Sequence, residues 1–251
     1  MIIQVYSDIH LEYLKSIPIF TPKCDVLVLA GDIGQIHLPS YKLFMDYVSN
    51  NWKKVFCVLG NHEYYSDKLS YEELRKKYNM FFQKYHNITL LDTKKETYKG
   101  IDFLGCTLWG YYPKNCDTNY INLLNRIKNR DSNNKLVSLK RDYLNTINEQ
   151  EKKWIKDNID LNRKTILITH YPTIIQGTSS PKWRDEKFKT LFANDLPINC
   201  IDLTAISGHT HFCYDFTDSI TGTRHIGNHR GYKDEIEAGE MNFNHNGLCR
   251  L

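Results

Sequence analysis

The feature that most constrains this chain is a junction that recurs five times, at which a short apolar run ends directly on residues of a metal-binding type. In α/β proteins, ligands lie beyond the carboxyl ends of parallel strands, where loops from several strands can converge. The pattern therefore predicts an α/β fold with one site at the strand ends. The polar residues at the ends of these runs are Asp8 and His10, Asp32, Asn61 with His62 and Glu63, His170, and His209 with His211.

The apolar runs themselves predict strands, because several are continuous and rich in β-branched residues, as expected of strands buried on both faces. Ser70 followed by Glu73 is a capping box, which predicts a helix start. The expected strands are 2–6, 25–30, 54–59, 88–91, 96–98, 101–107, 165–169, 203–207, 212–216 and 224–226, and the expected helices are 41–48, 71–85 and 136–159.

One segment differs in character from the rest of the chain. Residues 111–134 are polar, rich in Asn and only weakly periodic, and they come after a predicted strand. Long irregular segments in compact domains often carry function, so we expect this one to border a substrate entrance. No repeat or low-complexity linker divides the chain, and we predict one domain over residues 1–251.

Charge and cysteine content narrow the functional classes. The net charge of +4 is dispersed, which disfavours nucleic acid as a partner without excluding it. The seven cysteines include no C-x-x-C pair, a pattern typical of free thiols in a reducing compartment. No apolar run is long enough to span a membrane and no targeting segment is visible. We expect a cytoplasmic protein with no membrane association and no obligate protein partner.

The residue types at the five junctions suit a divalent metal. Aspartate, histidine and asparagine without cysteine favour ions such as Mn, Fe or Zn. Seven candidates exceed the needs of one ion, so two ions that share a bridging carboxylate are the simplest solution. Gly31, Gly60 and Gly208 each precede a candidate ligand, where glycine permits a sharp turn or a close approach.

In order and spacing, these motifs resemble the calcineurin-like metallophosphoesterase superfamily over residues 2 to about 232. Residues 103–109 (FLGCTLW) and 230–232 (RGY) are similar to a small bacterial-type branch. The resemblance implies a four-layer α/β/β/α sandwich, in which two mixed β-sheets are flanked by helices. The motifs that carry it are Asp8-x-His10, Gly31-Asp32, Gly60-Asn61-His62-Glu63, His170 and Gly208-His209-Thr210-His211.

The resemblance also implies roles by position. Two divalent ions would hold a hydroxide between them, and this hydroxide would attack the phosphorus of a phosphodiester or phosphomonoester. His62 would be the general acid that protonates the leaving oxygen. Asp32 would bridge the two ions, while Asp8, His10 and His211 would hold one ion and Asn61, His170 and His209 the other.

The residues immediately after Asp32 narrow the substrate. Phosphoprotein phosphatases continue with Asp-Arg-Gly at this point, whereas this chain continues with Ile33-Gly34. That departure disfavours phosphoproteins and favours a small organic or nucleotide phosphoester. The competing hypothesis is a catalytically weak scaffold of the same fold that binds a protein partner, but a scaffold has no use for the acid His62.

Four further residues have open roles. Arg230 is a candidate for binding a phosphate oxygen, with a surface salt bridge as the alternative. Tyr171 either packs or turns its hydroxyl toward the substrate. We interpret Glu63 as structural, accepting hydrogen bonds from nearby backbone, and His229 as a neighbour of the site that is not a ligand.

Overall fold

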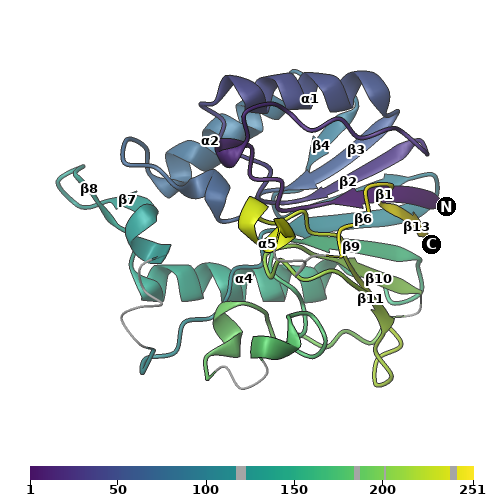
Figure 1. The fold of residues 1–251 in the computed structure, drawn as a ribbon. Coiled ribbons are helices and arrows are strands. Elements are labelled where there is room, and N and C mark those ends of the chain that lie inside the picture. The colour runs from purple at the N-terminus through teal and green to yellow at the C-terminus, as the bar shows by residue number, and fades with distance from the viewer. Residues whose placement is uncertain (117–122, 184–186, 201, 238–241) are drawn as a thin grey trace.

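The computed structural model describes residues 1–116, 123–183, 187–200, 202–237 and 242–251, and their elements form four layers (Figure 1). Helices α1 (Pro39–Asn51) and α2 (Tyr71–Phe82) form the first layer, and α4 (Arg141–Asn158) forms the fourth. Two β-sheets lie between them. The predicted α/β/β/α sandwich of two mixed sheets is therefore confirmed.

The first sheet has the strand order β13-β1-β2-β3-β4. Its strands β1 to β4 are parallel, while β13 pairs antiparallel with β1 at one edge. Leu29 of β2 lies beside Tyr6 of β1 and beside Cys57 of β3, so these three strands end at nearly the same level. The strands are β1 (Ile2–Tyr6), β2 (Val26–Ala30), β3 (Lys54–Val58), β4 (Ile88–Leu90) and β13 (Leu248–Arg250).

The second sheet has the order β11-β12-β10-β9-β6-β5, with β5 and β11 antiparallel at the two edges. Lys99 and Gly100 join β5 to β6 with φ values of 50° and 78°, as a tight hairpin turn requires. This confirms the predicted antiparallel portion. The strands are β5 (Lys94–Tyr98), β6 (Ile101–Cys106), β9 (Thr165–Thr169), β10 (Leu203–Ile206), β11 (Tyr214–Thr217) and β12 (Arg224–Gly227).

Three apolar clusters separate the four layers. Along β2, Val26 and Val28 belong to the cluster that also contains residues of the second sheet, while Leu27 and Leu29 belong to the cluster that contains α1. Side chains alternate across a strand, so a strand between two apolar layers must be apolar throughout. This is why the parallel strands were visible as continuous runs.

The capping box predicted the start of α2. The Ser70 hydroxyl accepts a hydrogen bond from the Glu73 backbone N–H at 3.3 Å, and the Glu73 carboxylate accepts one from the Ser70 N–H at 2.7 Å. The reciprocal pair satisfies two N–H groups that the first helical turn leaves free.

The predicted helix 136–159 was wrong at its start. Residues Leu136–Ser138 form β8, which pairs with β7 (Lys128–Arg130), and α4 begins only at Arg141. The side chain of Asp131 accepts hydrogen bonds from two backbone N–H groups of the connecting turn, and such local bonds compete with helix formation. The remaining elements are α5 (Lys233–Glu237) and the short 3-10 helices η1 (Leu11–Tyr13), η2 (His62–Tyr64), η3 (Pro181–Trp183) and η4 (Lys189–Leu191).

None of the helices in the described ranges is both long and apolar enough to cross a bilayer. Cys24, Cys57, Cys106, Cys213 and Cys249 are free thiols.

Candidate active site

The seven candidate ligands lie on the loops beyond the carboxyl ends of β1, β2, β3, β9 and β10. The structure brings them together, although they come from positions up to 203 residues apart in the sequence. Three groups of donor atoms each lie within 4.8 Å of one another. The groups are Asp8 with His10 and His211, His10 with Asp32 and His62, and Asp32 with His170 and His209.

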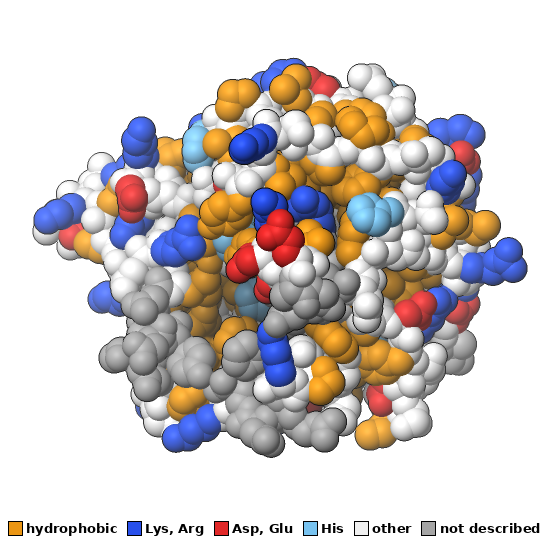
Figure 2. Space-filling view, viewed as in Figure 1, with side chains coloured by type: hydrophobic (Ala, Val, Ile, Leu, Met, Phe, Trp, Pro, Cys, Tyr) orange, Lys and Arg blue, Asp and Glu red, His pale blue; other side chains and the backbone are white. Residues whose placement is uncertain are grey.

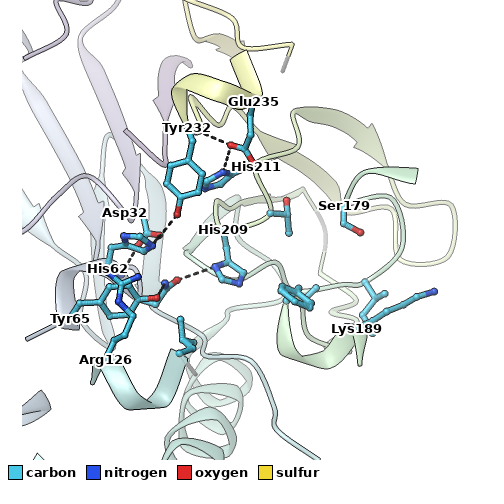
Figure 3. A pocket seen from close by; sticks show the side chains of 16 residues that line it. Asp32, His62, Tyr65, Arg126, Ser179, Lys189, His209, His211, Tyr232 and Glu235 are labelled. Atoms are coloured by element: carbon cyan, nitrogen blue, oxygen red, sulfur yellow. Dashed lines mark hydrogen bonds and ion pairs between the residues drawn. The ribbon is translucent and has the colours of Figure 1, made fainter. Parts of the chain in front are cut away.

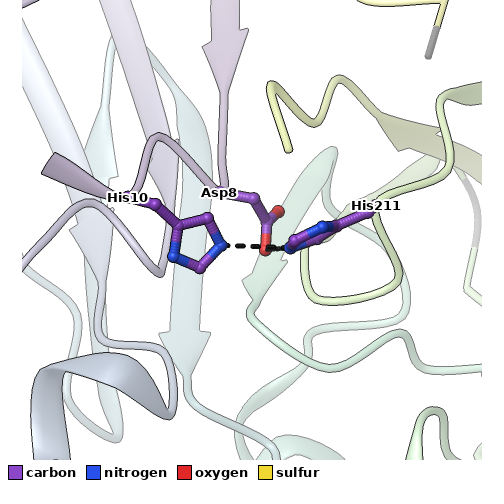
Figure 4. Close-up of side chains that lie close together, drawn as sticks. All are labelled: Asp8, His10 and His211. Atoms are coloured by element: carbon purple, nitrogen blue, oxygen red, sulfur yellow. Dashed lines mark hydrogen bonds and ion pairs between the residues drawn. The ribbon is translucent and has the colours of Figure 1, made fainter. Parts of the chain in front are cut away.

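The first donor set consists of Asp8, His10 and His211 (Figure 4). The Nε2 atoms of His10 and His211 are 3.0 Å apart, and His211 Nε2 is 3.5 Å from Oδ1 of Asp8. Three donor atoms from the loops after β1 and β10 therefore face one point.

The second donor set consists of Asn61, His170 and His209. Oδ1 of Asn61 lies 3.0 Å from Nε2 of His170 and 3.0 Å from Nδ1 of His209. The amide nitrogen of Asn61 donates to the Tyr65 hydroxyl at 2.6 Å. This hydrogen bond turns the amide so that its oxygen, the atom that can ligate a cation, faces the histidines.

Asp32 lies between the two sets. Its Oδ2 atom is 3.4 Å from Nε2 of His170 and 4.0 Å from Nε2 of His10. Its Oδ1 atom instead accepts a hydrogen bond from the His62 backbone N–H at 2.9 Å. One carboxylate oxygen thus faces both donor sets, which is the position of a bridging ligand.

The orientation of three histidines is set by hydrogen bonds on their outer side. The Nδ1–H of His10 donates to Glu12 (3.0 Å) and that of His170 donates to the Ala30 carbonyl (3.0 Å). The Nδ1–H of His211 donates to Glu235 (2.6 Å). Each bond leaves Nε2 with a lone pair that points inward. The two such lone pairs of His10 and His211, at 3.0 Å, repel unless a cation or proton lies between them, so the donor set fits divalent ions.

Without an ion, a proton is the available cation. Burial opposes the charge of His211, but Asp8 and Glu235 outweigh it and raise the pKa of His211 to about 10. A metal ion bound here would replace that proton, because a ligating imidazole must be neutral.

His62 lies beside the donor sets. Its Nε2 atom is 3.8 Å from Asp32 Oδ2 and 3.3 Å from the Tyr232 hydroxyl (Figure 3). Its Nδ1–H donates to Glu12 Oε1 at 2.7 Å. Burial disfavours the Glu12 charge, yet hydrogen bonds from His10 and His62 lower the pKa of Glu12 to about 2. An ionised Glu12 therefore fixes the His62 ring with Nε2 toward the site.

Glu12, Tyr232 and Glu235 were not predicted as site residues. Glu12 had a usable signal, because it comes after Asp8 and His10 at the same spacing of two and lies in the short helix η1. Glu235 lies in helix α5 and Tyr232 in the loop before it. Tyr232 is the last residue of the RGY motif, whereas nothing in the local sequence pattern marks Glu235.

Glu63 accepts four backbone hydrogen bonds. Oε1 accepts from Ile33 (2.8 Å) and Gly34 (3.2 Å), and Oε2 accepts from Asp32 (3.0 Å) and Gly60 (2.7 Å). Burial and the Asp32 carboxylate raise the pKa of Glu63 to about 8, and the backbone donors oppose that rise. This carboxylate ties the loop after β2 to the loop after β3, in agreement with its interpretation as structural.

Two of the glycines make room for the ligands. Gly31 has a φ of 84°, and a Cβ on it would lie 2.5 Å from Nδ1 of His170. A Cβ on Gly60 would collide with the Asp32 side chain. Both positions therefore need glycine because a ligand packs directly against the backbone.

Five candidate ligands have left-handed backbone conformations, which are uncommon for residues other than glycine. The left-handed region costs roughly 1–2 kcal/mol per such residue. The strained loops are what turn these side chains into the site instead of along the strands. The φ values are 52° for Asp8, 53° for His10, 51° for Asp32, 74° for His209 and 50° for His211.

The structure places Tyr171 beneath His209. Its side chain is fully buried, the two ring centroids are 3.8 Å apart, and its hydroxyl has no hydrogen-bond partner within the described part of the chain.

Arg230 is half-buried, which lowers its pKa, and it donates to the Ile9 carbonyl at 3.4 Å. No ion pair joins Arg230 to a carboxylate of the described residues. His229 lies behind the site, 3.4 Å from Asp8 Oδ2.

A cavity of about 630 Å³ opens over the donor sets. Figure 2 shows histidine side chains inside a hollow whose visible wall is largely apolar. Leu123 and Arg126, both from the segment 111–134, line this cavity together with Ile175 and Phe192. Residues 117–122 of that segment lie outside the described ranges.

Comparisons with known proteins agree with this fold. Uncharacterized protein L509 of Acanthamoeba polyphaga mimivirus is 29% identical over 270 residues, which cover 97% of this chain and 94% of the relative. The crystal structure of phosphopantetheinyl hydrolase (PptH) from Mycobacterium tuberculosis has a similar fold, with a TM-score of 0.67 and 17% identity over 99% of this chain and 95% of that one. The sequence profile of the calcineurin-like phosphoesterases matches residues 1–213, and the chain therefore belongs to that family.

Proposed function

We propose that this protein uses two divalent ions, of Mn, Fe or Zn, to hydrolyse a phosphodiester or phosphomonoester of a small organic or nucleotide substrate. The observation that carries the proposal is the position of Asp32 Oδ2, which faces His10 on one side and His170 on the other. A single ion would not need donors on both sides of one oxygen.

The chemistry can be divided between the ions and the protein. Two divalent ions held by these donor sets would polarise a phosphoryl oxygen and lower the pKa of a water molecule. His62 then supplies what the donor sets lack, a proton from Nε2 for the leaving oxygen. Glu12 holds the ring in the orientation for this transfer through the 2.7 Å hydrogen bond to Nδ1.

The size of the cavity is an argument for a small substrate. Its volume of about 630 Å³ suits a nucleotide or a compound of similar size. The loop after Asp32 lacks Asp-Arg-Gly, so the arginine that would clamp a phosphoprotein substrate is missing from it. This proposal requires no protein partner, nucleic acid or membrane.

The test is hydrolysis of bis(4-nitrophenyl) phosphate and 4-nitrophenyl phosphate with added Mn or Zn, with chelator, and with a phosphoserine peptide as the comparison. We expect metal-dependent release of nitrophenolate and little release of phosphate from the peptide. Asp32→Ala is the matched inactive control. Efficient dephosphorylation of the peptide with both small esters untouched would refute the substrate class, and a protein inactive on all three would favour the scaffold hypothesis.

A further inference from the structure

Arg126 occupies a fixed position at the margin of the cavity (Figure 3). The backbone of Ile127 forms a bridge with Tyr65, and the carbonyl of Arg126 accepts a hydrogen bond from the Ser66 N–H at 3.0 Å. Its guanidinium carbon lies 4.0 Å from the centroid of the Tyr65 ring, a distance at which a cation is attracted to the face of an aromatic ring.

The cation at Arg126 is available to a ligand. Nearby basic side chains of the same segment are engaged, since Arg130 pairs with Glu73 at 2.9 Å and Lys128 lies 3.9 Å from Asp67. Arg126 forms no ion pair with any acidic side chain in the described ranges. It is exposed to solvent within the cavity, so its guanidinium N–H groups can donate to an oxyanion.

The position of Arg126 relative to His62 indicates which part of a substrate it would reach. The Tyr65 ring contacts Arg126 and also lies 4.5 Å from the His62 ring. A general acid must lie within hydrogen-bond distance of the leaving oxygen. The leaving group therefore departs toward His62, and only the Tyr65 ring separates Arg126 from His62.

We propose that Arg126 binds an oxyanion carried by the leaving group, so that the natural substrate is a phosphoester whose leaving alcohol bears its own phosphate or carboxylate. This inference rests on the proposed function, because it uses His62 to define the leaving side. Leu123 lies on the same segment and lines the cavity, which provides an apolar contact for the body of the leaving group.

The experiment compares two chromogenic diesters, methyl 4-nitrophenyl phosphate and methyl 3-carboxy-4-nitrophenyl phosphate. They differ in one carboxylate on the leaving phenol. Arg126→Ala should lower kcat/KM about tenfold for the carboxylated ester, the lower end expected for a charged hydrogen bond at a solvent-accessible position. It should lower kcat/KM less than about twofold for the neutral ester, which makes no such bond.

Arg130→Ala is the matched control, since Arg130 belongs to the same segment, pairs with Glu73 and does not line the cavity. It should leave both substrates unchanged. An equal loss on both esters in Arg126→Ala would place the guanidinium on the reacting phosphoryl group and overturn the proposal. No loss on either ester would overturn it as well.

Failure of the proposed function would be recognised separately, because the wild-type protein would then hydrolyse neither ester. In that case, calorimetric titration of the two free phenols, 5-hydroxy-2-nitrobenzoate and 4-nitrophenol, tests the subsite. The wild-type protein should bind the carboxylated phenol more tightly than Arg126→Ala does. Equal binding by the two proteins would refute the subsite.

Discussion

Replacement of His62 by asparagine tests the acid role most directly. The substitution removes Nε2, which faces the site 3.8 Å from Asp32 Oδ2. The amide nitrogen of asparagine takes the place of Nδ1 and can still donate to Glu12. It leaves the His62 backbone N–H in place, so the hydrogen bond to Asp32 Oδ1 and the position of the Asp32 carboxylate should survive.

The expected loss depends on the leaving group. An alkoxide needs a proton in the transition state, and general acids contribute roughly 10²–10⁴-fold to such reactions. A nitrophenolate departs largely unaided, so its loss should stay below about tenfold. The ratio of the two losses, rather than either loss alone, measures the proton transfer.

The assay measures kcat for an alkyl phosphoester by phosphorus NMR and for its nitrophenyl analogue by absorbance, with metal content determined on the same preparations. We expect metal content near that of the wild type, because neither donor set requires His62. Equal losses on both substrates, with full metal content and intact folding, would refute the acid role. That result would indicate that His62 holds the phosphoryl group, a contact that every substrate shares.

Other residues give further predictions. Asp32→Ala should reduce bound metal from two ions per chain toward none, because it removes the oxygen between the two donor sets, and full occupancy in metal analysis would contradict the bridge. In denaturant titration at a pH above 8, where Glu63 is ionised, Glu63→Gln should lower the free energy of unfolding by about 3–5 kcal/mol, since an amide cannot accept all four backbone N–H groups; a loss under about 1 kcal/mol would count against this account. Tyr171→Phe should leave KM and stability nearly unchanged, because the hydroxyl it removes has no partner within the described ranges, whereas a raised KM would show that this hydroxyl reaches the substrate.

Most strands could be predicted because each parallel strand lies between two apolar layers, which leaves a continuous run in the sequence. β13 could not, since Leu248–Arg250 is short, lies at a sheet edge and depends on pairing with β1 at the opposite end of the chain. The start of α4 was misjudged because Asp131 stabilises a local turn, a preference that helical periodicity does not reveal.

The residues of the site can likewise be separated into those that the sequence predicted and those that it did not. The residues at the strand ends could be located from sequence because each lies immediately after its strand, and that two ions bind there stays a prediction. Glu12, Glu235 and Arg126 lie on short helical segments that approach the strand ends only after folding. Their contributions depend on distances, such as 2.6 Å from Glu235 to His211, that no local pattern encodes.

The left-handed backbone at five candidate ligand positions affects which substitutions would be favoured in a relative that has lost metal binding. Because glycine adopts this conformation without strain, a descendant that no longer used metal would gain stability by replacing those aspartates and histidines with glycine or asparagine. We therefore expect these strained residues to be retained in relatives that bind metal at this site. Distant relatives can be sorted by these five positions into those that still depend on metal and those that keep only the scaffold.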